Sequence, residues 1–260
     1  MEWYLYPAAM GVGILAGVIN TLAGSGSLVT LPLLALLGLP STVANATNRV
    51  GVVVQNVVGV VTFPHSLRAS LGNTGWLIVA VLPGGIAGAL AATRLTAAQM
   101  DLVIGGVMVV MLLILLYQPD RALRQQKGAP ERPPQFWTLL SFVAIGFYAG
   151  FIQAGVSVYI LAALVMGLHY NLVHATAVRL VAVLVVTVAA LLVFTNAGLV
   201  YWGIGLMLAL GQSIGAWIGV RLAIHTKRAR LWARRLLIAI VALAIVQFLD
   251  IVELVLNFYN

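Results

Sequence analysis

Long apolar runs separated by short polar connections are the feature that most constrains this chain. Of its 260 residues, 62% are hydrophobic and only 8% are charged, whereas about 25% of the residues in a soluble domain are charged. Several runs approach the roughly 20 apolar residues that a membrane-spanning helix requires. The runs lack the short alternating pattern of a transmembrane barrel, so the sequence predicts an all-α polytopic membrane protein.

The apolar runs divide into two groups of five on either side of a polar, proline-rich stretch. The predicted segments are 7–22, 28–38, 45–63, 75–93 and 102–117, followed by 136–152, 157–168, 172–194, 199–222 and 236–256. We therefore predict a first transmembrane repeat over residues 1–117, a basic cytoplasmic linker over 118–135 and a second repeat over 136–260. Each repeat is expected to have a broken or re-entrant helix pair followed by three membrane helices.

Matching motifs in the two groups indicate an internal duplication. Residues of the same type recur 127 positions apart in three pairs: Gly84 and Gly211, Gly88 and Gly215, and Arg94 and Arg221. Ala16-Gly17 recurs as Ala149-Gly150. The glycines spaced by four residues predict tight packing of helices, because small residues let two backbones approach closely.

The basic residues predict how the repeats are oriented. They concentrate in the linker and in a cluster over 227–235, and cytoplasmic loops of membrane proteins carry such an excess. Both clusters fall on one side only if each repeat crosses the membrane an odd number of times. The two repeats would then have inverted topology, with both termini outside. Basic clusters in cytoplasmic loops also account for the net charge of +8, so nucleic acid is not an expected partner.

Small polar residues interrupt the first broken pair at Gly24-Ser25-Gly26-Ser27, and the matching place in the second repeat reads Gln153-Ala154-Gly155-Val156-Ser157. Non-helical backbone at membrane depth is tolerated only where protein or a water-filled cavity surrounds it. One interpretation is a helix opening whose free N–H groups bind an anion. The alternative is a kink, or close packing through small residues.

Two arginines, Arg49 and Arg179, lie at corresponding places inside apolar segments of the two repeats. An ionised side chain there is costly unless it is paired, hydrated or functional. One interpretation is bidentate recognition of an oxyanion. The alternative is that each long side chain snorkels to the membrane interface.

Other polar side chains in apolar context either form hydrogen bonds between helices or line a polar cavity. We expect a central substrate site between the broken segments, formed by Asn20, Ser25, Gly26, Ser27, Thr47, Asn48, Arg49, Gln153, Gly155, Ser157, Thr176 and Arg179. The six acidic residues all lie in loops or near segment ends. A cation or proton site would need a central carboxylate, so the substrate is expected to be an anion or neutral.

The sequence favours a carrier over the other classes of membrane protein. The order Gly-Ser-Gly-Ser does not match the Gly-x-Ser-x-Gly of a serine hydrolase, and no catalytic residue, cofactor or metal site is expected. An anion channel would also line a polar path and remains an alternative, with an intramembrane enzyme a more distant one. The expected partners are a small anionic substrate and the lipid bilayer, and assembly as a homo-oligomer stays open.

The chain resembles the sulfite exporter TauE/SafE family of anion permeases over nearly its whole length. The resemblance is carried by the residues of 16–32, 44–49, 146–151, 175–177 and 211–222. It implies a transporter of the cell (inner) membrane for sulfite, organosulfonates or related organic anions. Departures from the family pattern fall on the expected site: Asn20 stands where an acidic residue is common, Ser25 and Ser27 where a longer glycine run is common, and Arg49 where Lys is common.

Overall fold

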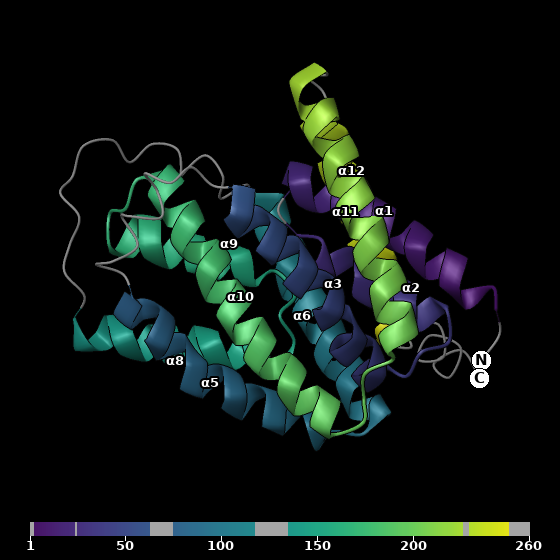
Figure 1. Cartoon of the computed structure of the whole chain (residues 1–260), viewed down its shortest axis with the longest axis horizontal. Helices are drawn as coiled ribbons and strands as arrows, with labels where there is room; N and C mark the ends of the chain where they lie inside the picture. Colours follow the sequence, from purple (N-terminus) through teal and green to yellow (C-terminus); the bar gives the residue numbers. More distant parts are fainter. Residues whose placement is uncertain (1–2, 24, 63–74, 118–134, 226–228, 250–260) are drawn as a thin grey trace, which may run out of the picture. The chain divides into compact units, whose positions relative to one another are not determined.

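The computed structural model describes residues 3–23, 25–62, 75–117, 135–225 and 229–249, and these ranges are helical with short connections (Figure 1). The elements of the first sequence half are α1 (Leu5–Ala23), α2 (Ser27–Leu36), α3 (Ser41–Thr62), α5 (Gly75–Thr93) and α6 (Ala97–Tyr117). Those of the second half are α8 (Phe136–Phe151), α9 (Val156–Ala162), the π-helix η2 (Ala163–Gly167), α10 (Leu172–Asn196), α11 (Trp202–His225) and α12 (Ala229–Phe248). The all-α prediction is confirmed for the described residues.

Two predicted boundaries were wrong for identifiable reasons. α6 begins at Ala97 rather than at residue 102, because Thr96 and Gln99 form a capping box in which each side chain bonds the other's backbone N–H. α12 begins at Ala229 rather than at residue 236. Arginine is a good helix former, and Arg234 donates a hydrogen bond to the backbone oxygen of Leu115 on α6. Residues 118–134 of the predicted linker lie outside the described residues.

Within the described ranges, six helices are long and apolar enough to cross a membrane: α1, α5, α6, α10, α11 and α12. The apolar helices α2 and α8 and the combined stretch Val156–Gly167 are shorter, at 10–17 residues. α3 is 22 residues long but carries a polar run that includes Asn45, Thr47, Asn48 and Arg49. The chain is therefore a multi-pass membrane protein in which short and polar helices accompany long apolar ones.

The described helices form two compact units, each of which draws on both halves of the sequence. The first unit comprises residues 1–48, 95–118 and 201–260, and the second comprises 49–94 and 119–200. The division falls within α3, so the first part of this helix belongs to one unit and the remainder to the other. Each unit is described by itself. The division into repeats over 1–117 and 136–260 stays a prediction.

In the first unit, α1 and α11 pack through glycines on both helices. A Cβ atom at Gly211 would lie 2.2 Å from the backbone oxygen of Met10, and one at Gly215 would lie 2.0 Å from that of Ile14. Contacts this short exclude any side chain, so the backbones touch directly. The prediction that the glycines of this row serve tight packing is confirmed.

In the second unit, α5 and α8 run side by side and pack in the same manner (Figure 1). A Cβ atom at Gly84 would lie 2.0 Å from the backbone oxygen of Val143, and one at Gly88 would lie 2.0 Å from that of Phe147. Val143 and Phe147 follow Met10 and Ile14 by 133 residues, and the glycines of the two rows differ by 127. Equivalent glycines therefore contact equivalent carbonyls in the two helix pairs.

Candidate functional site

Both predicted helix breaks are present. α1 ends at Ala23 and α2 begins at Ser27, while α8 ends at Phe151 and α9 begins at Val156. In the second break, Gln153 has φ of 62° and Gly155 has φ of 70°. This left-handed backbone cannot continue a right-handed helix, so the interruption follows from local conformation. Gly24, in the first break, lies outside the described residues.

Asn20 bridges the first break. Its side-chain oxygen accepts a hydrogen bond of 2.9 Å from the backbone N–H of Gly26. A Cβ atom at Gly26 would lie 2.8 Å from the Cβ of Asn20, so a larger residue at this position would displace the amide. Ser25, between them in sequence, is buried with 4% of its surface exposed. Asn20 thus holds the start of α2 beside the last turns of α1.

Asn48 of α3 is bonded to α2. Its side-chain oxygen accepts a hydrogen bond of 2.8 Å from the hydroxyl of Thr30, and its Nδ2 makes a longer contact of 3.4 Å with the hydroxyl of Ser27. Asn48 and Thr30 are both buried. The adjacent Thr47 accepts a hydrogen bond of 3.1 Å from the backbone N–H of Tyr201. In the first unit, the predicted polar residues therefore join helices through hydrogen bonds.

Arg49 is completely buried in the second unit, at 0% exposed. Its Nη1 donates to the backbone oxygen of Ala149 and, at 2.8 Å, to Oε1 of Gln153, while its Nη2 donates to the oxygen of Gly150 at 2.9 Å. Both carbonyls belong to the last turn of α8, where the helix leaves carbonyls unpaired and carries partial negative charge. Arg49 therefore caps this helix, and a snorkelling side chain does not fit its position.

Gln153 extends this contact to α10. Its Nε2 donates a hydrogen bond of 2.6 Å to the hydroxyl of Thr187, which itself donates at 2.6 Å to the backbone oxygen of Val183. The ring of Phe194 lies 5.5 Å from Cζ of Arg49, within the range of a cation–π contact. The second break is thus held by a continuous set of hydrogen bonds between Arg49, Gln153 and Thr187.

Arg179 on α10 differs from Arg49. Its side chain is only partly buried, whereas that of Arg49 is fully buried. Its Nε is buried, and its side chain makes no hydrogen bond to the residues that the structure describes. Thr176, one turn earlier, uses its hydroxyl to bond the backbone oxygen of Leu172 within the same helix. Because residues three apart share a helix face, Thr176 and Arg179 lie on one side of α10.

The remaining predicted residues of the second unit lie around α9. Gly155 is buried and immediately precedes the first residue of the helix, and Ser157 is partly buried at the second position. Within the described ranges, no group of three His, Cys, Asp or Glu side chains gathers as metal ligands would. The clusters consist of amides, hydroxyls and guanidinium groups, whose N–H and O–H donors suit an anion.

Sequence reasoning missed Thr30 and Thr187, the partners of Asn48 and Gln153. Thr30 is the single polar side chain in the apolar run 28–39, and Thr187 is the single one in 177–194 apart from Arg179. A lone threonine in a long apolar segment was therefore an available signal. What the sequence did not contain was its partner, which lies on another helix.

Comparison with known proteins relates the chain to probable membrane transporters. A "Probable membrane transporter protein ORF9" of Sinorhizobium sp is 28% identical over 93% of this chain and 90% of that protein. A "Probable membrane transporter protein YfcA" of Escherichia coli (strain K12) is 27% identical over 82% of this chain and 78% of that protein. No solved structure matches the chain.

The family model described as "Sulfite exporter TauE/SafE" matches residues 9–248. The chain therefore belongs to the TauE/SafE family. The family and its named relatives are membrane transporters, which are not a class of enzymes. A multi-pass member of this family lies, in bacteria, in the inner membrane.

Proposed function

We propose that the chain is a secondary transporter that moves a small anion across the membrane by alternating access, with sulfite, an organosulfonate or a related organic anion as substrate. The observation that carries the proposal is Arg179, a guanidinium on a membrane-spanning helix whose Nε has no hydrogen-bond partner among the described residues. Such a group is costly in a membrane unless it serves a function. The family description supports a sulfur oxyanion.

The two arginines have different roles in this proposal. Arg179 contacts the anion directly, because a planar guanidinium can pair two oxygens of a sulfite or sulfonate group at once. Arg49 positions the second break, since its two terminal nitrogens already donate to carbonyls and to Gln153. Its charge also raises the electrostatic potential in the second unit, which favours an anion there.

The neutral residues of the predicted site complete the proposal within each unit. In the second unit, Gln153, Gly155, Ser157 and Thr176 are the candidates that accompany Arg179. In the first unit, the start of α2 is the positive end of a helix dipole, which is a favourable place for an anion. The candidates there are Asn20, Ser25, Gly26, Ser27, Thr47 and Asn48.

The inverted topology of the two repeats belongs to the proposal as well. Each sequence half contains a broken pair, α1–α2 or α8–α9, whose second helix is short, followed by three helices of 19–25 residues. The equivalent glycine contacts in the two units support a duplication. Transporters built from inverted repeats with broken helices move one repeat-derived part against another around a fixed site.

Counterflow separates this proposal from the channel alternative. Proteoliposomes loaded with unlabelled sulfite would be placed in medium with a trace of radiolabelled sulfite. A carrier accumulates the label transiently above equilibrium because it exchanges one bound anion for another. A channel gives only passive equilibration, and that result would replace the carrier proposal. A parallel thermal-shift screen against sulfite, sulfate, sulfonates and carboxylates would identify the preferred anion, since a ligand of the folded state stabilises it.

A further inference from the structure

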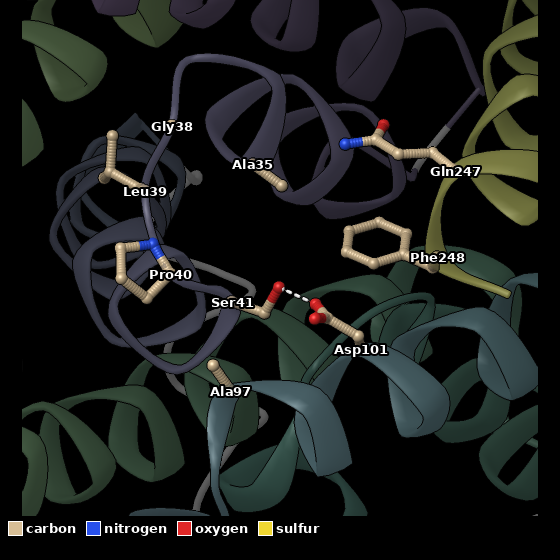
Figure 2. Close-up of a pocket in the computed structure, with 9 residues that line it drawn as sticks. All are labelled: Ala35, Gly38, Leu39, Pro40, Ser41, Ala97, Asp101, Gln247 and Phe248. Carbon is tan, nitrogen blue, oxygen red and sulfur yellow. Dashed lines mark hydrogen bonds between the residues drawn. The ribbon is translucent and has the colours of Figure 1, made fainter. Parts of the chain in front are cut away.

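The first unit contains a cavity of about 400 Å³ that none of the residues of the predicted anion site lines. Figure 2 shows it surrounded by the turn at residues 38–40, the start of α3 at Ser41, Asp101 of α6, and Gln247 and Phe248 at the end of α12. Its volume lies within the range of about 300–1,000 Å³ that is typical of small-molecule sites. The cavity is therefore large enough for a ligand with several heavy atoms.

The charge of the cavity is opposite to that of the protein as a whole. Asp101 is the only acidic residue among those that the structure describes, and none of the residues that line the cavity is basic. The full chain carries 14 Lys and Arg against 6 Asp and Glu. A single carboxylate in a cavity without a lining base favours a ligand with one positive charge.

Three hydrogen-bond acceptors line this cavity. The hydroxyl of Ser41 donates a hydrogen bond to Oδ1 of Asp101, which orients the carboxylate (Figure 2). Oδ2 of Asp101 makes no hydrogen bond within the described part of the chain. It can accept from a ligand, as can the Ser41 hydroxyl oxygen, which keeps both of its lone pairs, and the amide oxygen of Gln247. Three acceptors match the three N–H donors of a primary ammonium group.

The apolar lining distinguishes an organic cation from a metal ion. The ring of Phe248 lies between Gln247 and Asp101 in Figure 2, and Leu39 and Pro40 line the opposite side. An aromatic ring attracts an ammonium group, and the carbon stem of an amine can pack on the apolar walls. A bare sodium or calcium ion is held by oxygen ligands alone and would make no use of the aromatic and apolar walls.

We propose that this cavity binds a primary ammonium group, paired with Asp101 and seated against Phe248. The chemistry is shared by two sources, a free alkylamine and the headgroup of phosphatidylethanolamine. The site is separate from the residues of the proposed anion transport and does not depend on them. Occupation would link α3, α6 and α12, because the residues around the ligand come from these helices and from the turn after α2.

The test is thermal unfolding of the delipidated, detergent-solubilised full chain with two kinds of probe at constant ionic strength. The soluble probe is ethylammonium chloride, compared with tetramethylammonium chloride and sodium chloride. The lipid probe is short-chain phosphatidylethanolamine, compared with phosphatidylcholine of the same chains. We expect ethylammonium or phosphatidylethanolamine to raise the melting temperature in a saturable manner. The three controls should raise the melting temperature less. Tetramethylammonium and phosphatidylcholine lack N–H donors, and sodium lacks the organic stem.

Two variants assign the effect to the cavity. Asp101→Asn keeps the shape and the bond to Ser41 but removes the charge, and should weaken ammonium binding about tenfold. Gln247→Leu keeps the charge and removes one acceptor, so it should weaken binding by less. A response to the soluble amine alone identifies a free amine, and a response to the lipid alone identifies the headgroup. The proposal is overturned if neither source stabilises the parent protein, or if Asp101→Asn responds as the parent does.

Discussion

Arg49 and Gln153, which are 104 residues apart in sequence, are joined by a hydrogen bond of 2.8 Å between Nη1 and Oε1. The bond places the charged end of an α3 side chain against the point where α8 stops. Gln153 accepts it from within the break, where its backbone adopts the left-handed conformation at φ of 62°. The conformation of the break and the position of the arginine therefore depend on each other, and this dependence makes Arg49 a structural residue of the second unit.

Replacing Arg49 should destabilise the protein. Arg49→Gln removes the donors to the carbonyls of Ala149 and Gly150 and leaves these groups buried without a charged partner. We expect a loss of about 2–4 kcal/mol in the free energy of unfolding, since several charge-assisted hydrogen bonds disappear together. Arg49→Lys should lose less, because the charge stays. Unfolding in detergent measures both, and parental stability of Arg49→Gln would contradict the capping role.

Thr30→Val tests the bond that joins α2 to α3. Valine has nearly the shape of threonine, but it leaves the side-chain oxygen of Asn48 without its donor at 2.8 Å. An unsatisfied buried acceptor costs about 1–3 kcal/mol. The matched control is Thr93→Val, because the hydroxyl of Thr93 bonds only within its own helix. Equal melting temperatures for the two variants would show that the Thr30–Asn48 bond contributes nothing.

Two glycine substitutions separate helix packing from helix propensity. Gly88→Ala places a Cβ 2.0 Å from the backbone oxygen of Phe147, so α5 and α8 must move apart. Gly106→Ala, on α6, meets no atom within 4 Å and should be neutral or stabilising by about 0.5–1 kcal/mol. We expect a clear fall in the melting temperature for the first variant alone. Similar values for both would argue against direct backbone packing.

The proposed topology predicts which residues face the same side. Single cysteines at Lys127 and Arg230 should react with an impermeant thiol reagent only from the cytoplasmic side, and the natural chain contains no cysteine to interfere. The physical reason is the positive-inside bias of the two basic clusters. Labelling from opposite faces would exclude repeats of inverted topology with an odd number of crossings.

Sequence reasoning located most of the helices and both breaks, because apolar length and small polar residues are local signals. The segment 75–93 coincides with α5, and the glycine rows indicated their own packing role. It could not identify the partners of Asn48 and Gln153, because these depend on which helices lie together. The cavity at Asp101 could not be predicted for the same reason, because its lining comes from residues near 40, 100 and 247 and no local pattern unites them.

The same reasoning could not distinguish the two arginines. Arg49 and Arg179 occupy corresponding positions in the sequence and share the same two interpretations. The structure separates them, because the two terminal nitrogens of Arg49 donate to the end of α8, whereas the side chain of Arg179 makes no such hydrogen bond within the described ranges. Hydrogen-bond partners, rather than sequence context, therefore decide which arginine is available to a substrate.

The affinity of the Arg179→Gln variant for sulfite tests the central claim most directly. Loss of one charge-assisted contact of about 1.5–3 kcal/mol should weaken binding about ten- to a hundredfold, with the melting temperature of the unliganded protein little changed. Arg179→Lys should recover only part of the affinity, because an ammonium lacks the planar fork. Arg94→Gln removes an equal charge from an exposed position and should bind as the parent does. Sulfite binding at parental affinity by a monodisperse Arg179→Gln variant would contradict the proposed role of Arg179 in anion transport.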